Sequence, residues 1–104
     1  MSSKYQQSFT IVIDSDIKDL IPNFLSGRKK DITTIRSLLV DGNFELIQSI
    51  GHTLKGNGSG YGFDGISEIG KEIELAAIDP NPTQIQQKLK ELESYIEHVK
   101  IEFG

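Results

Sequence analysis

The sequence predicts an all-α protein, an up-and-down four-helix bundle with a short N-terminal extended arm or an extra helix. Apolar residues recur at helical spacing from residue 17 to the end of the chain. Turn signals divide this pattern into segments of helix length. A short stretch rich in β-branched residues, Phe9 to Asp14, has no convincing second strand to pair with. We therefore expect an arm over residues 1–13 and one bundle domain over residues 14–104.

The composition limits the kind of protein that this chain can be. It has 104 residues, enough for one domain with a modest core, and a formal net charge of −4. An acidic surface binds nucleic acid poorly, and a chain without cysteine has no disulfide or cysteine-based zinc site. No apolar run is long enough to span a bilayer, and the N-terminus lacks the apolar region of a secretory signal. We expect a soluble, cytoplasmic monomer that binds neither nucleic acid nor membrane.

The first helical segment follows the arm. Asp14 or Ser15 can cap its start. Pro22 lacks a backbone donor, so it either kinks this segment or lies in the first turn of a new helix. Residues 41–43, with the sequence DGN, form a turn signal that ends the segment. The apolar residues at helical spacing are Ile17, Leu20, Ile21, Phe24, Leu25, Ile32, Ile35, Leu38 and Leu39.

Two further helices are expected in the middle of the chain. The second helix runs from about Asn43 to about Asn57. The glycine-rich stretch Gly56 to Gly62 is expected to connect it to a third helix, because glycine weakens helices. The third helix covers about Asp64 to Ala77 and has its apolar residues on one face. The sequence DPNP, residues 79–82, breaks the chain again.

The last helix has the clearest start. Asn81 is a good N-cap, Pro82 suits the first helical position, and Gln84 can reach back in the manner of a capping box. The apolar residues alternate in steps of four and three, which is typical of a helix packed lengthwise in a bundle. They are Ile85, Leu89, Leu92, Ile96, Val99 and Phe103.

His52 is one of only two histidines, and it falls on the solvent side of the second helix. Gln48 lies four residues before it and Lys55 three residues after it, so both are its neighbours on the helix surface. An exposed, isolated histidine is most often a plain surface residue. The apolar residues that define the opposite, core-facing side are Leu46, Ile47, Ile50 and Leu54.

Two features point beyond a plain surface residue. Gly56 lies one turn after His52 on nearly the same face, and a glycine inside a helix costs about 1 kcal/mol relative to alanine. Clearing space around the imidazole for a docking partner would compensate for that cost. Lys55 is placed where its ammonium would meet an anionic group attached to His52, and a neutral imidazole is a good nucleophile for a phosphoryl group.

The segments HTLKG (52–56), GYGF (60–63) and ISEIGKEIELAA (66–77), with the upstream segments 19–32 and 41–51, resemble the histidine-containing phosphotransfer (HPt) domain of bacterial phosphorelays. The resemblance covers nearly all of the chain from Asp14 on. It implies a four-helix bundle in which His52 accepts phosphate on a ring nitrogen. It also implies that Lys55 is a supporting cation and that Gly56 keeps space for a partner. Gln48 is a further candidate site residue because of its place four residues before His52.

By this resemblance the protein is a phosphocarrier that takes a phosphoryl group from the aspartate of one receiver domain and passes it to another. Its partners would be the receiver domains of response regulators and hybrid sensor kinases. We expect no cofactor and no metal of its own, with magnesium on the partner receiver, and no ATP-dependent kinase activity. Two alternatives are a non-catalytic module that binds receivers, and the histidine-bearing domain of a chemotaxis-type histidine kinase.

Two other motifs are set aside. GYGFDG, residues 60–65, formally matches the dinucleotide-binding fingerprint, but that fingerprint needs a preceding strand, and a helix is expected there. His98 has no lysine and glycine partners like those of His52 and is expected to be a plain exposed residue. Two distant histidines make no metal site.

Overall fold

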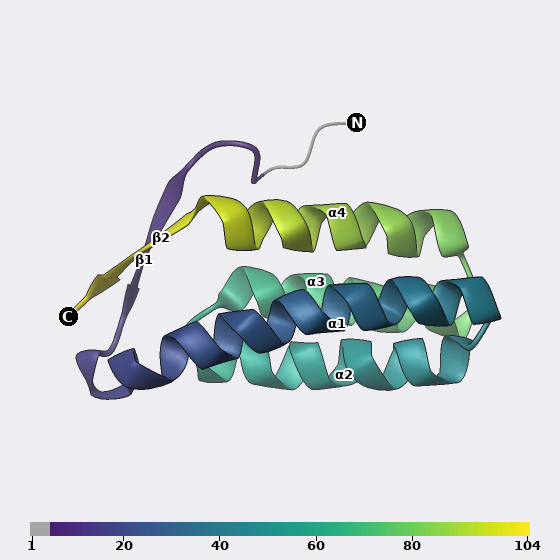
Figure 1. The fold of residues 1–104 in the computed structure, drawn as a ribbon, viewed down its shortest axis with the longest axis horizontal. Helices are drawn as coiled ribbons and strands as arrows, with labels where there is room; N and C mark the ends of the chain where they lie inside the picture. The colour runs from purple at the N-terminus through teal and green to yellow at the C-terminus, as the bar shows by residue number, and fades with distance from the viewer. Residues whose placement is uncertain (1–4) are drawn as a thin grey trace.

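The structure is a computed structural model that describes residues 5–104 and confirms the predicted helical bundle. Four α-helices lie along the long axis of the molecule, and a pair of short strands lies at one end (Figure 1). No helix within the described residues is long and apolar enough to cross a membrane. The elements in chain order are β1 (Phe9–Ile13), the 3₁₀ helix η1 (Ser15–Leu20), α1 (Ile21–Asp41), α2 (Phe44–Gly60), α3 (Asp64–Ile78), α4 (Pro82–His98) and β2 (Val99–Phe103).

The core lies between the four helices and consists mainly of isoleucine and leucine. Side chains from every helix are fully shielded there, among them Ile35, Ile47, Ile66, Ile73, Ile85 and Leu92. At the end nearest the strands, aromatic rings continue the core. Phe24 stacks on Tyr61 and on Phe63, with ring centroids 4.3 and 5.3 Å apart. These contacts fix the turn between α2 and α3 against α1.

Side-chain caps set several helix starts where the sequence predicts them. The Asp14 carboxylate accepts a hydrogen bond from the backbone N–H of Asp16 at 2.9 Å and begins η1. Asn43 caps α2 and Asn81 caps α4 in the same way, at 3.3 and 3.1 Å. Pro22 lies in the first turn of α1, so it starts a new helix and does not kink a longer one.

The expectation that the N-terminal segment has no strand partner is wrong. β1 pairs in parallel with β2, with Phe9 opposite Val99 and Ile13 opposite Phe103. The last helix therefore ends at His98, and Val99 and Phe103 belong to a strand although they continue the helical spacing. The stretch VKIEF also alternates apolar and polar residues, which is the strand period. Residues 1–4 of the expected arm lie outside the described residues.

The expectation that Gly56 to Gly62 form a connector is also wrong for most of that stretch, because α2 continues to Gly60. α2 remains helical through these glycines because α3 packs directly on its backbone. A Cβ atom at Gly58 would lie 2.5 Å from the backbone nitrogen of Ser67, and one at Gly51 would lie 2.7 Å from the backbone nitrogen of Glu74. The packing of α3 against this face compensates for the low helix propensity.

We expect Gly58→Ala to destabilise the protein by roughly 1–3 kcal/mol, because the added methyl group overlaps the α3 backbone. Gly56→Ala, in the same helix, is the matched control. A Cβ atom there meets nothing within 4 Å, so this variant should gain up to about 1 kcal/mol from helix propensity. Urea unfolding followed by circular dichroism measures both. Equal stability of the two variants would contradict the close contact between α2 and α3.

Candidate functional site

His52 lies in the middle of α2 and points away from the core, as the sequence predicts. Its side chain is 68% exposed. The neighbouring residues Gly51 and Leu54 are buried, so the helix turns its apolar side inward and presents the imidazole on its surface. An accessible imidazole on a rigid helix is suited to reaction with a group carried by another protein.

Glu74 on α3 holds one nitrogen of this imidazole. Its Oε2 atom lies 2.8 Å from Nδ1 of His52. A carboxylate only accepts hydrogen bonds, so this contact places a proton on Nδ1. In the neutral ring the lone pair is then on Nε2, the nitrogen that Glu74 does not contact. The site therefore presents one defined nucleophilic atom.

Lys55 contacts the same carboxylate. Its Nζ atom lies 3.1 Å from Oε1 of Glu74, so the carboxylate joins His52 and Lys55. The hydrogen bond from Lys55, followed by that from His52, lowers the pKa of Glu74 below its ordinary value of 4.5, although burial opposes this shift. Glu74 is thus ionised at neutral pH. The ammonium of Lys55 and the imidazole of His52 are therefore joined through the Glu74 carboxylate.

Close packing of the two helices puts Glu74 in reach of His52. Gly51 and Gly70 face each other across the interface, and a Cβ atom at Gly70 would lie 2.6 Å from the Cβ atom of Leu54. Glu74 is not among the site residues expected from the sequence, because helical periodicity alone places residues 66–77 in a helix with one apolar face. The signal available was Gly70 one turn before Glu74, since a buried glycine on a helix face allows close approach of a neighbour.

The remaining predicted site residues lie around the same imidazole. Gln48 and His52 line a shallow hollow of about 490 Å³, together with Glu45, Leu46, Ser49 and Glu74. Leu46, which the helix wheel placed on the core side, is 50% exposed. Gly56 is exposed, and the space where its side chain would be is open. The surface beside His52 thus combines small, apolar and polar groups.

Comparison with protein families shows which family this chain belongs to. The family model of the Hpt domain matches residues 19–101, which is most of the chain. The chain belongs to the Hpt family. No curated protein and no solved structure matches it. Membership of this family places the chain in histidine phosphotransfer within phosphorelays, where Hpt domains act with receiver domains.

His98, the second histidine of this Hpt domain, has a different setting. It is the last residue of α4 and is partly buried, not exposed as the sequence suggested. Its Nδ1 atom lies 2.9 Å from the carbonyl oxygen of Ser94 in the preceding turn.

The GYGFDG stretch runs from the end of α2 through the turn into α3 and follows a helix, so it lacks the strand that a dinucleotide site needs.

We expect Glu74 to titrate below pH 4.5, and Lys55→Met to raise its midpoint because the main stabilising hydrogen bond is lost. The lowered pKa stabilises the fold above the unfolded-state pKa, and that stability disappears as the pH falls through the folded pKa. Carboxyl chemical shifts in an NMR titration measure the midpoint. Lys30→Met, on the exposed surface of α1, is the control and should leave it unchanged. An unchanged midpoint in Lys55→Met would show that Lys55 and Glu74 are not paired.

Proposed function

We propose that this Hpt domain is a phosphocarrier that accepts a phosphoryl group on His52 from an aspartyl phosphate of one receiver domain and passes it to the aspartate of another. The observation that carries this proposal is the contact between Glu74 and Nδ1 at 2.8 Å on a histidine that is otherwise exposed. It leaves Nε2 as the nitrogen available to an incoming phosphorus. The receivers would belong to response regulators and hybrid sensor kinases.

The forward reaction needs no proton transfer. The lone pair of Nε2 attacks phosphorus in line with the bond to the aspartyl oxygen, a P–N bond forms, and the P–O bond breaks to release the receiver carboxylate. Because Nδ1 keeps its proton, the phosphorylated ring is an imidazolium. Its positive charge lies 2.8 Å from the Glu74 carboxylate, which stabilises it.

The return reaction uses the same groups. The carboxylate of a second receiver attacks phosphorus, the P–N bond breaks, and the electron pair returns to Nε2. A ring protonated on Nδ1 leaves as a neutral imidazole, which is a better leaving group than an imidazolate anion. Lys55 would support both directions by keeping Glu74 ionised beside the imidazolium, because its ammonium pairs with that carboxylate. The receiver is expected to contribute the magnesium ion.

Docking of a receiver would use the surface around His52. Gly56 leaves open space one turn after the histidine, and Leu46 and Gln48 line the hollow before it. Such a surface suits a weak, transient complex, which turnover between two receivers requires.

We further propose that the protein works as a monomer in the cytoplasm. Its lack of cysteine is compatible with that reducing compartment.

Incubation with a phosphorylated receiver domain tests this function. We expect His52→Gln to abolish phosphoryl uptake and to leave the bundle folded, because the side chain is 68% exposed and surface substitutions change stability little. His98→Gln is the matched control and should take up phosphate like the wild type. Phosphate on the His52→Gln variant, or loss of its helical circular dichroism, would make the assignment of the site wrong.

The same experiment separates the two alternatives. A non-catalytic receiver-binding module would bind the receiver and show no phosphorylation of the wild-type protein. The histidine-bearing domain of a chemotaxis-type kinase would be phosphorylated by a separate ATP-binding domain and not by a receiver. Either outcome would contradict the proposed phosphocarrier function and support the corresponding alternative.

Gly56 tests where the receiver docks. We expect Gly56→Leu to slow phosphotransfer strongly, because its side chain fills the open space beside His52, and to leave the bundle folded. Gly56→Ala should have an intermediate rate and a higher stability, so rate and stability move in opposite directions. Transfer assays and thermal unfolding of the same proteins measure both. A normal rate for Gly56→Leu would mean that the receiver docks elsewhere.

A further inference from the structure

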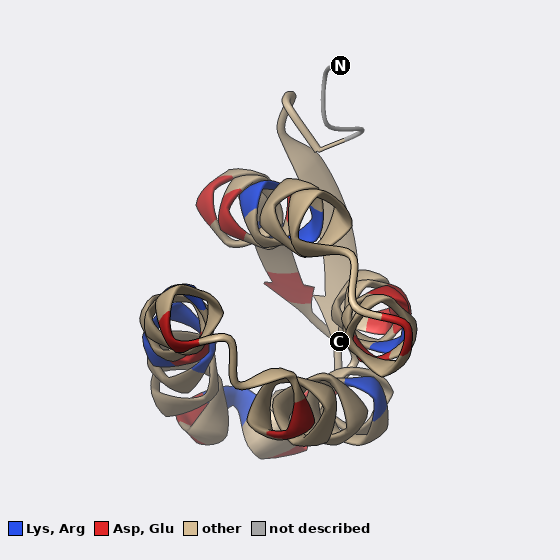
Figure 2. Cartoon of the chain, turned by 90° about the vertical axis from the view of Figure 1, so that its right-hand side faces the viewer, with Lys and Arg blue, Asp and Glu red and all other residues tan. Residues whose placement is uncertain are grey.

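The edge of the bundle formed by α1 and α4 lies opposite the edge that carries His52. Each helix packs against the next along the chain, and α4 packs against α1. In the end-on view of Figure 2 the four helices surround the core, and the α1–α4 edge lies across it from the α2–α3 edge. A ligand on the α1–α4 edge would leave His52 accessible.

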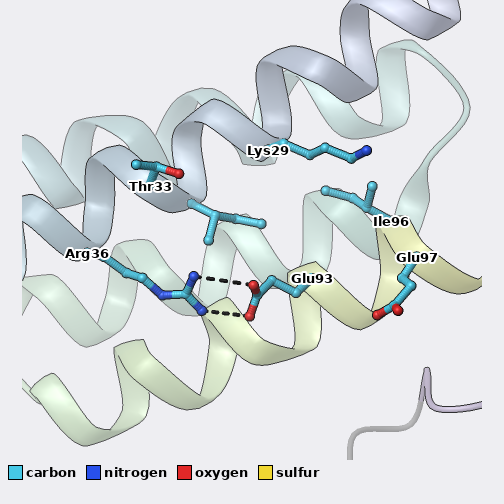
Figure 3. A pocket seen from close by; sticks show the side chains of 7 residues that line it. Lys29, Thr33, Arg36, Glu93, Ile96 and Glu97 are labelled. Atoms are coloured by element: carbon cyan, nitrogen blue, oxygen red, sulfur yellow. Dashed lines mark hydrogen bonds and ion pairs between the residues drawn. The ribbon is translucent and has the colours of Figure 1, made fainter.

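Two hollows lie along this edge, and an ion pair separates them. Arg36 on α1 makes two contacts with the carboxylate of Glu93 on α4, at 2.6 and 3.2 Å. Figure 3 shows this pair at the border of the first hollow, which also has Lys29 and Glu97 on its walls. Because charges of both signs line the first hollow, it favours no particular ligand.

The second hollow has a more uniform lining. It measures about 410 Å³ and is lined by Arg36, Leu39 and Val40 from the end of α1, and by Pro82, Gln86 and Lys90 from the start of α4. We call it the Val40 hollow. Val40 is 88% exposed, more than any other large exposed apolar residue in the described part of the chain.

The charged groups of the Val40 hollow are cationic, although the chain has a net charge of −4. Arg36 already forms a hydrogen-bonded ion pair with Glu93. Lys90 forms no ion pair with any residue between 5 and 104. Asp41 follows Val40 in the chain but does not line the hollow. An apolar surface beside an unpaired ammonium favours a ligand that is both apolar and anionic.

The spacing of the lining residues favours a helix. Pro82, Gln86 and Lys90 follow one another at steps of four on α4, and Arg36 and Val40 do so on α1. Rows with this spacing are the ridges between which the side chains of another helix pack. Two copies of this chain would fit poorly, because a twofold axis through the hollow would bring Lys90 and Arg36 close to the same cations of the other copy.

We propose that the Val40 hollow binds an acidic amphipathic helix of a partner protein. An apolar side chain of that helix would cover Val40, Leu39 and Pro82, and a neighbouring carboxylate would pair with Lys90. This is the binding mode in which an amphipathic helix lays its apolar face into a groove. The partner could hold the Hpt domain while receivers exchange phosphoryl groups at His52 on the opposite edge.

A titration with a synthetic helical peptide tests this proposal, with leucines at helical spacing and glutamates between them. We expect amide chemical-shift changes at the residues other than proline that line the Val40 hollow. A peptide with lysine in place of every glutamate should bind much more weakly. Lys90→Glu should weaken binding by roughly threefold to tenfold, and Val40→Ser by roughly threefold or more. The matched controls Lys71→Glu on α3 and Val12→Ser on β1 should bind like the wild type.

Several outcomes would overturn the proposal. Equal binding of the acidic and basic peptides would exclude charge recognition, and shift changes around His52 would place the ligand on the other edge. Normal binding by Lys90→Glu and Val40→Ser would exclude the hollow. Shift changes at the hollow that depend on protein concentration without peptide would mean that a second copy occupies it.

Discussion

The close contact between α2 and α3 determines the geometry of this Hpt domain. Gly51 and Gly58 on α2 and Gly70 on α3 bring the two backbones so near that a Cβ atom at any of them would overlap the other helix. Interiors packed at this density transmit small displacements, so the two helices behave as one rigid unit. The position of Glu74 relative to His52 depends directly on this contact.

The same contact explains how an exposed histidine acquires a defined chemical state. An imidazole that is 68% exposed would normally exchange its proton between both nitrogens and water. Glu74 is only 15% exposed and is fixed by its helix, so its contact with Nδ1 orients the ring and leaves Nε2 uncontacted by this carboxylate. Lys55 keeps Glu74 ionised and adds a positive charge beside the imidazole. One carboxylate thus links the fold to the chemistry proposed for His52.

Local sequence signals predicted much of this structure, and tertiary contacts decided the rest. The caps at Asp14 and Asn81 and the exposure of His52 follow from propensities and helical periodicity within one segment. Local signals do not predict the continuation of α2 to Gly60, and at residues 99–103 they fit a helix and a strand equally. The continuation of α2 depends on the backbone of α3, and the strand at residues 99–103 on β1, far away in the sequence.

Glu74 shows the same limit at the site. Lys55 and Gly56 are found from their distance to His52 along one helix, whereas Glu74 comes from the next helix and needs the register between the two. Buried glycines on both faces mark this register, since they show where two helices approach most closely. Helix wheels treat each helix alone and contain no information about it.

The most direct measurement is the identity of the phosphorylated nitrogen. The protein, labelled with ¹⁵N in its histidine rings, would be phosphorylated by a receiver domain and studied by NMR. The coupling between ³¹P and ¹⁵N identifies the bonded atom. The contact between Nδ1 and Glu74 predicts a phosphoryl group on Nε2 of His52, with the proton kept on Nδ1. A phosphoryl group on Nδ1 would contradict the role assigned to Glu74 and with it the proposed chemistry of the site.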